Sequence, residues 1–188
     1  MKPVFFFAGW KRPVKEFTGL LEQLGRPYVK FHDTDNRWFM DPKWKNEIQQ
    51  ALDKHGPPAL SIGCSMGGFA ALYHQPQIRA DMVLAFGPQG TSISSEVKSI
   101  GGYKADAWAK NLKSITGNRL PPPCGNYSIY FGNHTDTGIG NSGHSQLITK
   151  AGYNITTIEL SNPNEHDVAK VLYQDGKLID IIKMHLNS

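Results

Sequence analysis

The sequence predicts a three-layer α/β fold in which a mostly parallel, six-stranded sheet carries helices on both faces. Short β-rich runs alternate with helical patterns along the chain, as expected when each strand is joined to the next by a crossover helix. Most of the expected strands are nearly continuous apolar runs, which is typical of strands covered on both faces. The 188 residues, 39% of them hydrophobic, suffice for one core. We therefore expect a single domain over residues 1–188, without a separate cap domain.

The expected strands follow in chain order. The first lies in the longest apolar run of the chain, which extends from Val4 to Trp10, and the third begins directly after the loop signal Pro57-Pro58. The others are short runs rich in β-branched and aromatic residues. The six expected strands are 4–8, 28–32, 59–62, 82–86, 127–131 and 155–160.

Helical patterns fill the connections between these strands and follow the last one. They cover residues 14–24, 42–55, 66–74, 105–114, 145–151, 167–173 and 177–186. Proline and asparagine clusters at 121–123 and 162–164 mark loops. The one long connection, 87–125, has room for a small lid or binding loop.

Charge and composition exclude several classes of function. The net charge is +4, and the 20 basic residues are scattered among 16 acidic ones, as on ordinary solvated faces. No nucleic-acid-binding motif is present, so we expect no nucleic-acid partner. The longest apolar run is too short to cross a bilayer, and the N-terminus lacks the apolar core of a signal peptide. We expect no membrane partner, a cytoplasmic location, and free thiols at Cys64 and Cys124.

The most informative segment joins the third strand to the helix that follows it, through Gly63-Cys64-Ser65-Met66-Gly67. This is a G-x-S-x-G pattern between a strand and a helix, where the serine occupies a sharp, strained turn. Glycines two residues before and after the serine let neighbouring backbone approach without a Cβ clash. A phosphate-binding loop of the Walker type would need Lys-Ser or Lys-Thr after its last glycine, and Phe69-Ala70 stands there. We interpret Ser65 as a nucleophile; the alternative is a glycine-rich turn with an inert serine.

A serine hydroxyl needs a general base to become a nucleophile. In α/β folds whose nucleophile lies in a G-x-S-x-G turn, the three catalytic groups occur along the chain in the order serine, acid, histidine. Each of them follows the C-terminal end of a strand. His166 lies in the loop that follows the last expected strand, whereas His185 lies in the final helix, and we interpret His166 as the base. The alternative is a surface histidine beside the start of a helix that Asp167 or Asn164 caps.

The carboxylate that would orient this histidine is expected a few residues past the fifth strand. Asp136 stands there, and the alternative for it is the capping of a turn by its side chain. Glu165 and Asp167 are its rivals, although both adjoin the base in sequence. His134 and His144 lie near the acid loop, without metal-ligand partners at a convincing spacing, so we expect no metal.

The oxyanion of an acyl intermediate also needs donors. We expect one from the backbone amide of Met66, directly after the serine, and one from the amide of Trp10, where Gly9 permits a close turn. A plain buried tryptophan is the alternative for Trp10. Trp38 and Phe39, beyond the second strand, are expected to shape a substrate pocket together with His134.

With these residues in place, the chain resembles a compact α/β-hydrolase from residue 4 to residue 186, starting at the strand that carries the oxyanion loop. A closer resemblance within this superfamily is to small hydrolase-like proteins of bacterial capsule and glycan biosynthesis. It rests on SMGGFAAL at 65–72, LAFGPQ at 84–89 and HDVA at 166–169. The stretch FFAGW at 6–10 is similar to esterases that act on carrier-bound acyl groups. These resemblances imply ester or thioester chemistry without naming a substrate.

The sequence therefore predicts a serine hydrolase of carboxylic esters or thioesters that needs no cofactor, with a small-molecule or carrier-bound acyl substrate. Acyl transfer to an alcohol or sugar would use the same residues. A third interpretation is a non-catalytic binding module on a hydrolase scaffold. A fourth is dinucleotide binding, since Gly138-Ile-Gly140-Asn-Ser-Gly143 fits G-x-G-x-x-G and Glu159 could serve as the ribose acid. That motif stands late in the chain and seven residues past Phe131, which argues against it.

Overall fold

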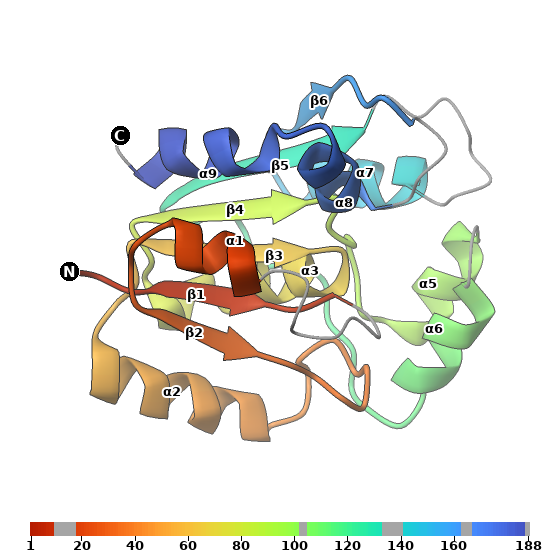
Figure 1. Cartoon of the computed structure of the whole chain (residues 1–188). Helices are drawn as coiled ribbons and strands as arrows, with labels where there is room; N and C mark the ends of the chain where they lie inside the picture. The colour runs from red at the N-terminus through yellow and green to blue at the C-terminus, as the bar shows by residue number, and fades with distance from the viewer. Residues whose placement is uncertain (10–17, 102–104, 133–140, 163–166, 187–188) are drawn as a thin grey trace.

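The computed structural model describes residues 1–9, 18–101, 105–132, 141–162 and 167–186. Six parallel strands form one sheet in the order β2-β1-β3-β4-β5-β6 (Figure 1). The strands are β1 (Val4–Phe7), β2 (Tyr28–Phe31), β3 (Leu60–Cys64), β4 (Met82–Phe86), β5 (Asn126–Gly132) and β6 (Thr156–Ile158). The predicted α/β sheet is confirmed, and every strand pair in it is parallel.

Helices cover both faces of this sheet because successive strand residues point to opposite sides. On β1, Val4 and Phe6 belong to one buried cluster, whereas Phe5 and Phe7 belong to the other. The first cluster takes buried side chains from α1 (Thr18–Gln23), α8 (Val168–Gln174) and α9 (Leu178–Leu186). The second takes them from α2 (Lys43–His55), α3 (Met66–Tyr73), α4 (Gln75–Ile78), α5 (Ser94–Ile100), α6 (Ala105–Leu112) and α7 (Asn141–Lys150). The three-layer arrangement is thus confirmed.

The predicted elements agree with the structure to within a few residues, with two short helices added. The pattern over 66–74 ends at His74, after which α4 forms a separate turn of helix. α5 was not predicted because its sequence carries a single fully buried apolar residue, Val97, and therefore no helical period. Both α5 and α6 belong to the long 87–125 connection, and in Figure 1 they lie on the side toward which the strand arrows point.

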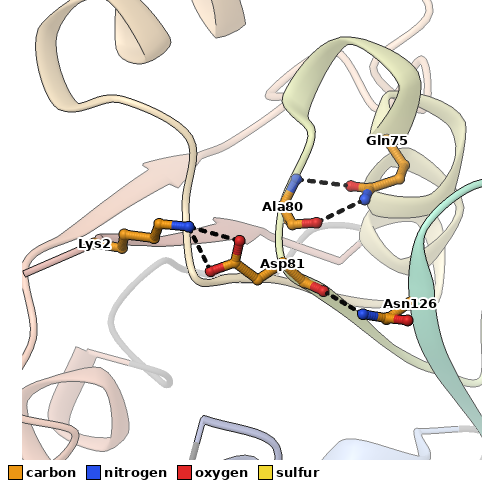
Figure 2. A network of polar contacts seen from close by, with 5 residues as sticks. All are labelled: Lys2, Gln75, Ala80, Asp81 and Asn126. Atoms are coloured by element: carbon orange, nitrogen blue, oxygen red, sulfur yellow. Dashed lines mark hydrogen bonds and ion pairs between the residues drawn. The ribbon is translucent and has the colours of Figure 1, made fainter. Parts of the chain in front are cut away.

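At the amino ends of the strands, a polar network connects the beginnings of three strands (Figure 2). Lys2, just before β1, forms an ion pair with Asp81, just before β4, at 2.7 Å. The Asn126 side chain at the start of β5 donates to the Asp81 carbonyl at 3.2 Å, and Gln75 exchanges two hydrogen bonds with the Ala80 backbone. Side-chain contacts therefore connect the amino ends of the strands, whereas the candidate site lies at their carboxyl ends.

Two further sequence-based expectations concern membrane-spanning helices and disulfide bonds. Within the described residues, no helix has the length and apolar character needed to cross a membrane. Cys64 is buried at the end of β3 and Cys124 is exposed, and neither forms a disulfide bond, as predicted.

Candidate active site

Ser65 stands between the last residue of β3 and the first residue of α3. Its backbone has φ 52° and ψ −117°, a region that residues with a Cβ seldom occupy. The Ser65 amide donates to the Phe86 carbonyl of β4 at 2.9 Å, and its carbonyl accepts from the Phe69 amide at 3.1 Å. The turn therefore changes from sheet pairing to helix pairing within one residue, which forces the strained conformation.

Two glycines permit this turn because each has backbone pressed against its Cα. A Cβ on Gly63 would lie 2.0 Å from the Gly67 carbonyl oxygen, and one on Gly67 would lie 2.0 Å from the Phe7 carbonyl oxygen. A Cβ on Gly68 would meet the ring of Pro88 at 3.0 Å. The close approach expected from the G-x-S-x-G pattern is present in the structure.

Met66 is the first residue of α3, and its side chain is buried. The amides of a first helical turn have no partner inside the helix, and the helix dipole adds positive potential there. These properties suit an oxyanion donor, although the role of the Met66 amide stays a prediction.

Gln89, in the loop that follows β4, contacts the Ser65 hydroxyl. Its Nε2 donates to Ser65 Oγ at 2.7 Å, and the side chain is 1% exposed. In the sequence, Gln89 ends the LAFGPQ stretch, and no role is predicted for it there. Its position was the available signal, since it follows β4, and parallel neighbours end at the same edge of a sheet.

The loop that carries Gln89 is held on several sides. The Gly87 amide donates to the Tyr130 carbonyl of β5 at 2.7 Å, and the Gly90 amide donates to Nδ1 of His144 on α7 at 3.2 Å. Since Nδ1 accepts, the neutral His144 ring carries its proton on Nε2. A Cβ on Gly90 would lie 2.7 Å from the His144 carbonyl oxygen, so loop and helix are in direct backbone contact.

Trp38 and Phe39, the expected pocket residues, lie in the loop between β2 and α2 and are buried in the core. Trp38 packs against Phe69 of α3 at a ring-centroid distance of 5.9 Å. Both residues have positive φ, 59° and 58°. The Asp33 carboxylate accepts from the Phe39 amide at 3.0 Å. Their role in a substrate pocket stays a prediction.

His74, which follows α3, supports the same loop. Its Nε2 donates to the Phe39 carbonyl at 3.0 Å, because a carbonyl can only accept. Burial lowers the pKa of His74 to about 4, so the ring is neutral at pH 7.

Four of the expected site residues lie outside the described residues. They are Trp10, His134, Asp136 and His166, and Glu165 lies outside as well. Asp167 is described, and its carboxylate caps α8 by accepting from the Lys170 amide at 3.0 Å. Asp167 thus has the capping role that was the alternative for it.

Of the three glycines in the dinucleotide motif, Gly143 is the one that lies within the described residues. Gly143 lies inside α7, where a Cβ would sit 2.6 Å from Cγ2 of Ile100 on α5. The absence of a side chain at this position therefore serves helix packing. Within the described ranges no cluster of three His, Cys, Asp or Glu side chains is arranged to hold a metal ion.

No protein-family model matches the chain, and no curated protein matches its sequence. Solved structures do resemble it over nearly its whole length. One is a protein of Xanthomonas campestris assigned to the α/β-hydrolase superfamily, with a TM-score of 0.56, 12% identity, and coverage of 97% of this chain and 98% of that one.

Two other solved structures carry more specific descriptions. The capsule O-acetyltransferase of Neisseria meningitidis serogroup A has a TM-score of 0.59 and 14% identity, with coverage of 100% of this chain and 88% of that one. A hormone-sensitive lipase from a metagenome library has a TM-score of 0.63 and 11% identity, with coverage of 98% and 76%. The chain has the α/β-hydrolase fold, which hydrolases and an acyltransferase share; at such identities the likeness concerns the fold alone.

Proposed function

We propose that the protein is a serine hydrolase that cleaves a carboxylic ester or thioester. The observation that carries the proposal is Ser65 in its strained turn, φ 52° and ψ −117°, between a buried parallel strand and a helix N-terminus. Maintaining that conformation requires two glycines in backbone contact, and an inert serine would not need it. The fold shared with esterases and lipases supports the same chemistry.

In the proposed reaction, Ser65 Oγ forms a bond to the acyl carbon while its proton passes to His166. The carbonyl π electrons move onto oxygen, and the amides of Met66 and Trp10 bind the resulting oxyanion. Asp136 holds the imidazole of His166 in the tautomer that accepts this proton.

Collapse of the tetrahedral intermediate breaks the bond to the leaving alcohol or thiol, which takes the proton from His166. Water then repeats the sequence on the acyl-enzyme and regenerates Ser65. Trp38, Phe39 and His134 shape the substrate pocket in this proposal.

Labelling with a fluorophosphonate tests the nucleophile and the reaction class together. We expect one adduct, on Ser65, and a loss of ester hydrolysis on the order of 10⁶-fold in Ser65→Ala. Ser61 is a matched control, because it is a buried serine on β3, four residues before Ser65. Ser61→Ala should still be labelled. A folded wild-type protein without an adduct would refute the hydrolase and favour the non-catalytic binding module.

Acyl transfer is the second candidate, and the likeness to a capsule O-acetyltransferase over the whole chain favours it. Transfer differs from hydrolysis in the group that attacks the acyl-enzyme, since a sugar hydroxyl takes the place of water. Incubation with p-nitrophenyl acetate and an excess of a hexose separates the two. Acetylated hexose as the main product indicates a transferase, and free acetate alone indicates a hydrolase.

A further inference from the structure

We propose that Gln89 is a catalytic hydrogen-bond donor to the nucleophile, whose side-chain amide stabilises the negative charge that develops on Ser65 Oγ. This inference rests on the proposed function, and it adds a residue to the site that the triad pattern does not include. It predicts a contribution to the rate of attack on the acyl group.

The contact itself is direct. Gln89 Nε2 donates to Ser65 Oγ at 2.7 Å, a short distance for an N–H donor. A hydrogen bond to the charged form of a group favours that form. The Gln89 amide therefore makes the Ser65 hydroxyl a stronger acid at the moment its proton leaves. The same bond assists the reverse event, when Oγ regains charge as the acyl-enzyme breaks down.

The orientation of the amide suits this role. Because Nε2 faces Ser65, the hydroxyl accepts from Gln89 and keeps its own proton for the base. The other end of the side chain, Oε1, is buried and has no hydrogen-bond partner among the described residues. Leaving a buried acceptor unmet lowers stability, so an apolar side chain of similar length would suit the fold better. The buried amide of Gln89 therefore lowers the stability of the fold, and its contact with Ser65 is the reason we give for its presence.

The loop around Gln89 is arranged so that the donor does not have to be positioned during the reaction. The Gly87 amide is hydrogen-bonded to β5, Pro88 packs on Gly68 of α3, and the Gly90 amide is hydrogen-bonded to His144 of α7. A donor held by its surroundings pays no reorganisation cost when charge develops. Such attachment on both sides of one residue is what a preorganised donor requires.

The rate of fluorophosphonate labelling measures this step. In that reaction the bond from Ser65 Oγ to phosphorus forms, the P–F bond breaks with loss of fluoride, and the hydroxyl proton passes to the base. Gln89→Met fills the same space without a donor, and we expect its second-order labelling rate constant to fall about 10-fold, the value of one hydrogen bond.

Gln75→Met is the matched control. Gln75 is also a buried glutamine, but it bonds the Ala80 backbone at the opposite edge of the sheet. We expect this variant to lower the melting temperature and leave the labelling rate unchanged. An equal loss of labelling rate in the two variants, in step with their stabilities, would reduce Gln89 to a structural residue.

Gln89→Glu provides a pH profile that a structural role would not produce. An ionised glutamate has no proton to donate, accepts a hydrogen bond from the Ser65 hydroxyl and repels negative charge on Oγ, so we expect labelling about 100-fold slower than in the wild type at pH 8. When the pH falls below the pKa of this glutamate, its protonated carboxyl can donate a hydrogen bond to Ser65 Oγ. The ratio of the wild-type rate to the variant rate then becomes smaller. His144 of α7 and Glu96 of α5 also contact this loop, through Gly90 and Thr91, but both are present in the wild type and in the variant, so their influence cancels in the ratio of the two rates.

The outcomes separate the two proposals. Wild-type labelling on Ser65 with unchanged rates in both Gln89 variants overturns the role of Gln89 and leaves the serine hydrolase standing. A folded wild-type protein that takes no label overturns both. A ratio of wild-type to Gln89→Glu labelling rates that stays constant with pH also overturns the donor role.

Discussion

Two turns at the carboxyl edge of the sheet adopt positive φ without glycine, and they are supported in different ways. Ser65 follows β3 with φ 52°, whereas Trp38 and Phe39, in the loop after β2, have φ 59° and 58°. At Ser65 the support is backbone, since Gly63 and Gly67 let a strand and a helix press together. At Phe39 the support is side chains, because Asp33 accepts from its amide and His74 donates to its carbonyl.

The difference teaches where a strained conformation can be foreseen. The partners of the turn at Ser65 include glycines two residues away on either side, so the pattern is local and visible in the sequence. The loop at Phe39 depends on a histidine 35 residues later, which contacts it only after β1 and β3 have paired. We expect the first turn to respond to changes of volume and the second to respond to pH.

Gly67→Ala should produce the largest effect. The new Cβ would lie 2.0 Å from the Phe7 carbonyl oxygen, so α3 or β1 must move, and we expect a loss of about 4 kcal/mol or more in the free energy of unfolding. Urea unfolding measures it. Gly19→Ala is the control, because nothing lies within 4 Å of its Cβ position in α1 and a helix favours alanine. Similar stabilities for the two variants would contradict the backbone support of the Ser65 turn.

Acid should weaken the side-chain-supported loop by a smaller amount. Burial lowers the pKa of His74 to about 4, whereas an unfolded histidine has a pKa of about 6.5. Below pH 6.5 His74 binds a proton in the unfolded chain but not in the folded chain, so the free energy of unfolding falls as the pH falls toward 4. Above pH 6.5 His74 has no effect on the pH dependence of stability. The expected loss is about 3 kcal/mol.

His74→Gln isolates this effect, because glutamine can still donate to the Phe39 carbonyl but does not titrate in this range. Denaturant unfolding at pH 7 and at pH 4 should show a smaller decrease for the variant than for the wild type. Parallel decreases in the two proteins would mean that His74 is protonated in the folded state without cost.

The smallest effect compares two substitutions at Ser65. Both Ser65→Gly and Ser65→Ala remove the hydroxyl and its bond with Gln89, but only glycine relieves the strain at φ 52°. We expect Ser65→Gly to be more stable than Ser65→Ala by about 1 kcal/mol, the reverse of the order at ordinary positions. Thermal unfolding of the two inactive variants measures the difference. A more stable alanine variant would show that the turn is unstrained.

Much of the fold could be predicted because its signals are local. The apolar runs of β1, β3 and β4 and the alternating helices define a parallel sheet, and the predicted strand boundaries differ from the observed ones by at most two residues. The helices α4 and α5 could not be predicted, since they are short and bury too few residues to create a period. Their positions depend on the core that surrounds them.

By itself the sequence determined the sheet, the turn at Ser65 and the glycines that allow it, because these depend on hydrophobic period and on contacts within a few residues. The tertiary structure decided that Gln89 reaches Ser65 Oγ and that His74 supports Phe39. Neither contact has a signal in the spacing of residues, since each joins two loops whose proximity follows from strand order. A side-chain hydrogen bond between distant segments requires positions correct to less than an ångström, and only the packed sheet supplies that accuracy.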